Sequence, residues 1–179
     1  INPGDVYLLS DPYEAGGNHL PDWVIARPVF VGDVRVAFAC NRAHQSDIGG
    51  GAAGTYNSSA TDIFQEGIRL PALKLFERDV LREDLWKLLL LNCRTPHYLD
   101  GDLRAMIGST QIGAELVAER IESLGLDVGR AYLEGIMDHA DQRFRSAIRA
   151  LPDGVYHGAD AFDDDCFEPL VVPIKVTLT

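Results

Sequence analysis

Two short motifs in the first third of the chain share one spacing, a histidine followed three residues later by an aspartate. They are His19-Leu20-Pro21-Asp22 and His44-Gln45-Ser46-Asp47. Imidazole nitrogens combined with carboxylate oxygens suit Zn²⁺, Mn²⁺ or Fe²⁺ better than Ca²⁺, which prefers oxygen ligands alone. Whether these side chains can act as one metal site depends on whether the fold brings the two motifs together.

The segment between the motifs has the pattern of a β-hairpin. Residues 23–30 and 34–39 are rich in Val, Ile and Phe, which favour strands. Gly32-Asp33 separates the two runs and suits a tight turn between antiparallel strands. The first motif therefore precedes the first strand, and the second motif follows the second strand.

Antiparallel pairing about this turn brings the motifs to one end of the hairpin. It gives partner numbers that sum to about 65, so Asp22 is expected to face Ala43 and His44 to face Pro21. Opposed residues in such a ladder have Cα atoms only about 4.5–5.5 Å apart. Two imidazoles and two carboxylates, the last from Asp47, are thus predicted to converge. A bound cation would offset the mutual repulsion of the carboxylates, which otherwise raises their pKa values.

A structural role is the alternative for each motif taken alone. A single histidine near a strand end commonly serves as a hydrogen-bonding group, and an aspartate after proline commonly makes a turn. The pairing of two motifs by one hairpin favours the metal site.

A loop of small residues at 49–61 follows the second motif, and Gln65-Glu66-Gly67 follows the loop. Glu66 is a candidate general base or extra ligand, or else an ordinary surface acid. The loop could hold phosphate through its backbone N–H groups. It lacks the Gly-Lys-Ser/Thr ending of a P-loop, so no nucleotide site is predicted there.

The remaining elements predict an α+β fold. A β-hairpin-rich N-terminal part precedes a short helix at 83–91 and a central helical pair at 97–124 and 127–150, and strands return near 155–156 and 171–178. The chain begins at Ile1 without a methionine and ends within an alternating run, which favours an internal fragment of a larger subunit. Residues 1–179 are therefore expected to form a single segment of that subunit.

Composition narrows the class of protein. A formal net charge of −11 argues against a nucleic-acid partner. Three cysteines far apart in the sequence, Cys40, Cys93 and Cys166, favour reduced thiols and a cytoplasmic location. No apolar run approaches the roughly 18–20 residues that cross a bilayer, so no membrane association is expected.

Several motifs, in order along nearly the whole segment, resemble the hydantoinase B/5-oxoprolinase family, which includes the B components of N-methylhydantoinases and relatives in the acetone and acetophenone carboxylases. The matching stretches are residues 4–13, 16–22, 42–50, 65–67, 92–103 and 152–165. The sequence departs from the commoner family pattern at Gln45, where many members have a second histidine, and at Asn18, where a threonine is usual. A neutral amide at position 45 does not shuttle protons near neutral pH.

The resemblance implies an ATP-dependent amide hydrolase that works with an A-type, ATP-binding subunit in a hetero-oligomer. ATP would be used through that partner, and the substrate would be a cyclic amide such as hydantoin, oxoproline or a related lactam. By motif position His19, Asp22 and His44 match metal ligands. Asp47 is the fourth candidate, unless a carboxylate preceding Ile1 completes the site.

Attack on an ATP-activated amide at a divalent metal (Zn, Mn or Fe) is the predicted mechanism, with Asp47 or Glu66 as candidates for proton transfer. Two alternatives remain open: a ketone carboxylase subunit, and a non-catalytic scaffold that contacts the A-type subunit.

Overall fold

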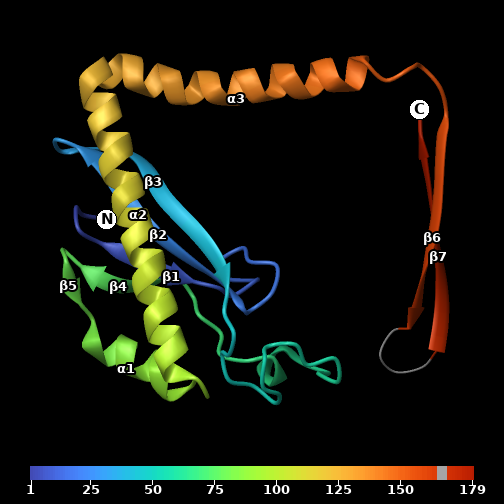
Figure 1. Ribbon diagram of the computed structural model, residues 1–179, viewed down its shortest axis with the longest axis horizontal. Coiled ribbons are helices and arrows are strands. Elements are labelled where there is room, and N and C mark those ends of the chain that lie inside the picture. The colour runs from blue at the N-terminus through green and yellow to red at the C-terminus, as the bar shows by residue number, and fades with distance from the viewer. Residues whose placement is uncertain (165–168) are drawn as a thin grey trace. The chain divides into compact units, whose positions relative to one another are not determined.

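The computed structural model describes residues 1–164 and 169–179 (Figure 1). Asp165 and Cys166 lie outside the described residues. The chain forms two compact units, residues 1–130 and 131–179, each described by itself. That the whole of 1–179 forms a single segment of one larger subunit stays a prediction. Among the described helices, none is both long and apolar enough to cross a membrane.

The first unit is built on a five-stranded sheet with the order β3-β2-β1-β4-β5. Its strands are β1 (Val6–Leu9), β2 (Asp22–Val31), β3 (Val34–His44), β4 (Leu73–Glu77) and β5 (Val80–Leu81). Every neighbouring pair in this sheet is antiparallel. With helices on a wholly antiparallel sheet, the predicted α+β class is confirmed.

The β2–β3 hairpin is confirmed, and both strands extend further than their apolar runs indicated. Pairs near the turn, such as Phe30 with Arg35, have numbers that sum to 65, as expected from the tight turn. The register then shifts between Val29 and Phe30, because β3 contains one residue more than β2 at a β-bulge. From that point the partners sum to 66, so the predictions that Asp22 faces Ala43 and that His44 faces Pro21 are wrong: Asp22 faces His44.

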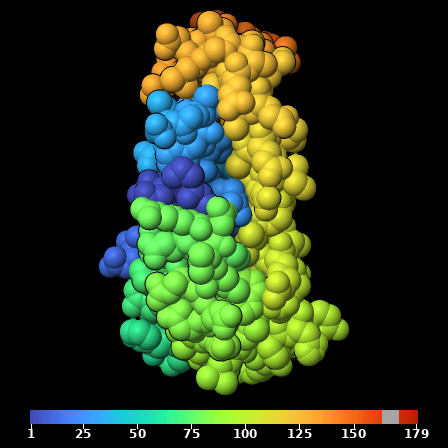
Figure 2. Space-filling model, turned by 90° about the vertical axis from the view of Figure 1, so that its left-hand side faces the viewer, coloured from blue at the N-terminus to red at the C-terminus, as the bar shows by residue number. Residues whose placement is uncertain are grey.

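Two helices complete the first unit. These are α1 (Glu83–Leu91) and α2 (Pro96–Leu124), with Pro96 at the first turn of α2, where a missing N–H costs nothing. α2 packs on β2 and β3, and Figure 2 shows it as a yellow-green column against the blue and green residues of the sheet. The core between the layers contains Leu8, Trp23, Ile25, Leu75 and Leu103, all fully buried. α2 also reaches the end of the hairpin that carries the histidines, where the sulfur of Met106 accepts a hydrogen bond from Gln45.

The second unit contains most of α3 (Leu126–Arg149) and a hairpin of β6 (Tyr156–Asp164) and β7 (Pro169–Leu178). The sequence predicted α3 within one residue at each end. It predicted only the beginning of β6, because polar and acidic residues interrupt the apolar pattern there. The β4–β5 hairpin, which turns through Arg78 and Asp79 with positive φ angles, was not predicted.

Candidate metal centre

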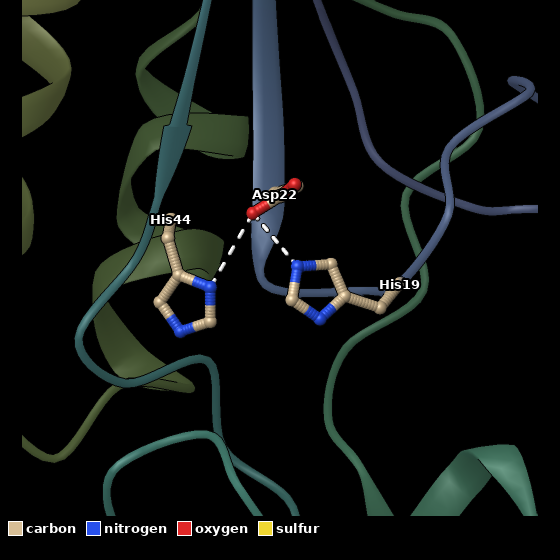
Figure 3. A group of neighbouring side chains, drawn as sticks. All are labelled: His19, Asp22 and His44. Atoms are coloured by element: carbon tan, nitrogen blue, oxygen red, sulfur yellow. Dashed lines mark ion pairs between the residues drawn. The ribbon is translucent and has the colours of Figure 1, made fainter. Parts of the chain in front are cut away.

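His19, Asp22 and His44 meet at one end of the β2–β3 hairpin (Figure 3). The Nε2 atom of His19 lies 2.8 Å from Oδ1 of Asp22, and the Nδ1 atom of His44 lies 3.3 Å from the same oxygen. One ligand atom from each residue fits within a group whose members are all within 4.8 Å of one another. Three of the four ligands predicted from the sequence are therefore brought together.

Each member is positioned by a different element. Asp22 is the first residue of β2 and His44 the last residue of β3, so direct pairing across the ladder brings them together. His19 comes from the preceding loop, whose backbone the buried carboxylate of Asp11 organises by accepting the N–H groups of Tyr13 and Glu14, both at 2.8 Å. The site thus combines two hydrogen-bonded strands with a loop whose backbone is held by Asp11.

The pKa of Asp22 reflects its burial and its two histidine neighbours. Burial alone would raise the pKa of Asp22, but hydrogen bonding and charge from His19, and then from His44, lower it below its ordinary value. The carboxylate is therefore held ionised between two imidazoles. Two nitrogens and one carboxylate oxygen are a donor set that fits Zn²⁺, Mn²⁺ or Fe²⁺, as the ligand types alone predict.

Asp47, the fourth predicted ligand, lies elsewhere. Its Oδ1 accepts the backbone N–H groups of Gly49 and Arg94, and its Oδ2 accepts Nη1 of Arg94 at 3.0 Å. Burial alone would raise the pKa of Asp47, but these hydrogen bonds and the guanidinium lower it. Both oxygens of the Asp47 carboxylate therefore accept hydrogen bonds, and Asp47 holds Gly49 and Arg94 together.

Arg94 also contacts the loop of small residues at 49–61, called the glycine loop below. Its guanidinium donates to the carbonyl oxygens of Gly49, Gly50 and Ala52. The arginine thereby ties the loop to the start of α2. Arg94 lies in one of the stretches that resemble the family, but no role was predicted for it, because nothing in the spacing links residue 94 to residue 47.

Gln45 and Glu66, the other polar residues considered near the motifs, are not in the group. The Gln45 side chain is buried, and its amide donates to the Ala43 carbonyl and to the sulfur of Met106. Gln45 therefore points into the core, since side chains alternate along an extended segment. Glu66 is half-buried at the end of the short 3₁₀ helix at Ile63–Gln65.

Two residues of the glycine loop that the sequence did not single out contact His44. The Thr55 hydroxyl oxygen lies 2.7 Å from Nε2 of His44, and the Tyr56 ring stacks on the imidazole with centroids 5.2 Å apart. Thr55 is buried and has a positive φ of 64°. A β-branched residue in that region is strained by about 1–3 kcal/mol. No local pattern marked Thr55, because its partner lies on β3.

An α+β fold with a His–Asp–His group at the end of a hairpin defines a candidate metalloprotein. The chain belongs to the hydantoinase B/oxoprolinase family, whose sequence model matches residues 1–179. It is 36% identical over 164 residues to the beta chain of the caprolactamase of Pseudomonas jessenii, covering 92% of this chain and 28% of the relative. It is 34% identical over 182 residues to the B component of a putative D-/L-hydantoinase of Pseudomonas sp. (strain NS671), covering 100% of this chain and 31% of that relative.

Solved structures agree with this assignment. The crystal structure of the ATP-dependent caprolactamase from Pseudomonas jessenii matches with a TM-score of 0.87 and 33% identity, over 100% of this chain and 31% of the other. A nucleotide-free acetone carboxylase matches with a TM-score of 0.82 at 18% identity, over 99% of this chain and 24% of the other. The second likeness concerns the fold alone. The chain spans less than a third of the length of these relatives.

Proposed function

We propose that this chain forms the metal-binding part of an ATP-dependent hydrolase of cyclic amides. The observation that carries the proposal is that nitrogens of His19 and His44 both lie close to one carboxylate oxygen, Oδ1 of Asp22. A neutral imidazole and an ionised carboxylate are both electron-pair donors, so gathering three of them around one point favours a cation between them.

In this proposal the three side chains hold a divalent ion of the Zn²⁺, Mn²⁺ or Fe²⁺ class. When bound, such an ion supplies a Lewis acid that polarises an amide carbonyl or lowers the pKa of water. The paired strands β2 and β3 place Asp22 and His44, and His19 joins them from the preceding loop. A further carboxylate or imidazole from outside these residues would complete a four-ligand set.

Glu66 remains the candidate for proton transfer. It is half-buried and next to the glycine loop. The donors that bind the Asp47 carboxylate, Gly49 and Arg94, do not bind the side chain of Glu66. A carboxylate whose pKa is lowered and whose oxygens already accept several donors is a weak base, which disfavours Asp47 for this step.

The proposal assigns ATP to a separate A-type, ATP-binding subunit or domain, and a hydantoin, oxoproline or related lactam as the substrate. Its support is the similarity to an ATP-dependent caprolactamase and to a protein named as the B component of a hydantoinase. A hetero-oligomer in the cytoplasm is part of the same proposal.

Metal content of the purified full chain tests the proposal. Elemental mass spectrometry is expected to find near-stoichiometric Zn, Mn or Fe in the wild type and little in His19→Ala and His44→Ala. His97→Ala is the matched control, because His97 is exposed on α2 and outside the group. A metal-free wild type that still supports ATP-dependent turnover with its partner would overturn the metal assignment. Dependence of ATP turnover on bicarbonate would indicate a carboxylase instead of a hydrolase.

A further inference from the structure

The glycine loop returns to the metal group through two consecutive residues, Thr55 and Tyr56. The Thr55 hydroxyl meets the edge of the His44 imidazole at Nε2, at 2.7 Å. The Tyr56 ring covers one face of the same imidazole, with an angle of 16° between the rings. The loop therefore contacts His44 at its Nε2 edge and on one face, while Nδ1 faces Asp22.

The protons around Thr55 decide which nitrogen of His44 carries hydrogen. A threonine hydroxyl has one proton. The Thr55 hydroxyl donates it to the carbonyl oxygen of Gly54 at 2.7 Å. With its proton in that bond, the hydroxyl oxygen accepts toward His44, and Nε2 is the donor. In a neutral imidazole the other nitrogen, Nδ1, then carries a lone pair.

That lone pair faces Asp22. Nδ1 of His44 lies 3.3 Å from Oδ1 of Asp22, an atom that also only accepts. Two acceptors in this arrangement repel each other unless a proton or a cation lies between them. We propose that Thr55 is a positioning residue that fixes the Nε2–H tautomer of His44, so that Nδ1 presents its lone pair to the divalent ion. This inference rests on the metal site proposed above.

The backbone of Thr55 supports the role of the hydroxyl. Its φ of 64° lies in the left-handed region, which disfavours a β-branched side chain and suits glycine. The backbone conformation at this position therefore disfavours threonine, whereas the threonine hydroxyl supplies the contact with Nε2 of His44. Arg94, by holding the carbonyls of Gly49 and Gly50, keeps the loop in place.

Four variants of the full chain separate positioning from a structural role. Thr55→Ser keeps the hydroxyl, and Thr55→Val keeps the shape without it. Thr55→Gly removes the hydroxyl and relieves the backbone. Ser59→Ala is the matched control, because Ser59 carries an exposed hydroxyl in the same loop.

The first readout is the dissociation constant for Zn²⁺, measured by competition with a chromophoric chelator. Partners that orient a metal-ligating histidine typically contribute about 10–100-fold to metal affinity. We expect this loss in Thr55→Val and Thr55→Gly, and affinities close to wild type in Thr55→Ser and Ser59→Ala. Thr55→Gly is the sharpest case, because its thermal midpoint should not fall although its affinity does. Unchanged affinity in folded Thr55→Val and Thr55→Gly would overturn the inference.

The second readout needs no metal. Imidazole ¹⁵N shifts of His44 report the tautomer. They are measured in metal-free Asp22→Ala, which lacks the carboxylate that would otherwise hold a proton on Nδ1, and are assigned by comparison with the same variant carrying His44→Gln, at about pH 9, well above the ordinary imidazole pKa. Asp22→Ala alone and with Thr55→Ser should show hydrogen on Nε2, and Asp22→Ala with Thr55→Val should show a mixture. If the wild type binds no metal, the proposed function fails, while these shifts still decide the tautomer. Hydrogen on Nδ1 in Asp22→Ala would refute the role of Thr55.

Discussion

Asp22 and His44 are direct partners across the β2–β3 ladder, and the β-bulge between them and the turn makes them so. Without the bulge, the register that starts at the turn would place Asp22 opposite Ala43. Side chains on neighbouring positions of a strand point to opposite faces, so a one-residue shift decides whether the imidazole reaches the carboxylate. The metal group therefore depends on the bulge as much as on the residue types.

The first prediction concerns the anionic ligand. Asp22→Asn preserves the size of the side chain but removes the charge on which both histidines converge. We expect metal affinity to fall by more than the ~10–100-fold that loss of an outer partner typically costs, because a direct ligand is lost. Chelator competition measures the change. Asp33→Asn, in the exposed turn of the same hairpin, is the control and should bind as the wild type does.

Local patterns in the sequence predicted much of the fold. Helices α1 and α2 follow regular apolar spacing and were located to within one residue or at their observed bounds. The hairpin was predicted because its turn and both apolar runs are contiguous. β4 and β5 were missed because they are short: β4 is held by pairing with β1, and β5 by pairing with β4, instead of by their own pattern.

The site was predictable only where it depends on the hairpin. His19, Asp22 and His44 converge because one local element joins their motifs. The same spacing argument included Asp47, but a long-range partner, Arg94, binds that carboxylate. Thr55 and Tyr56 reach His44 through a loop without periodicity, and no sequence rule gives the path of such a loop. Contacts between distant segments therefore account for what the sequence did not reveal.

A second prediction separates the two roles of Asp47. Asp47→Asn weakens the pair between the buried Asp47 carboxylate and the exposed Arg94. Charge-assisted hydrogen bonds contribute about 1.5–3 kcal/mol, and the exposure of Arg94 to solvent sets the expected cost at the lower end of that range. We expect a lower free energy of unfolding of about that size, measured by urea titration. Metal content at saturating Zn²⁺ should remain near that of the wild type. A stable Asp47→Asn protein that has lost its metal would instead identify Asp47 as the fourth ligand.

A third prediction compares two glycines of the loop that differ in their surroundings. Gly50 and Gly54 have similar positive φ angles, 79° and 87°. A Cβ atom at Gly50 would lie 2.6 Å from the carbonyl oxygen of Gln65, whereas one at Gly54 would meet nothing within 4 Å. Gly54→Ala should cost about 1–2 kcal/mol for the left-handed backbone alone.

Gly50→Ala should cost clearly more than Gly54→Ala, because backbone atoms near Gln65 must also move. Thermal unfolding of the two variants measures the difference. Equal midpoints would contradict the close packing of the loop on residues 65 and 66. The comparison also bears on the metal site, since the same loop carries Thr55.

The last prediction concerns the acid stability of the loop that carries His19. The hydrogen bond from Arg69 lowers the pKa of Asp11 from 3.8 to about 2; burial opposes this, and the N–H groups of Glu14 and Tyr13 support it. A carboxyl whose pKa is lowered by folding stabilises the protein fully above its ordinary pKa. That stabilisation disappears as the pH falls through the folded value. The difference in urea midpoint between wild type and Asp11→Asn should therefore be largest near neutral pH and shrink between pH 3.8 and about 2. Asp102→Asn, which changes an exposed carboxyl on α2, should show little difference at any pH. A gap between wild type and Asp11→Asn that stays constant down to the lowest pH would mean that the charge of Asp11 does not stabilise the loop.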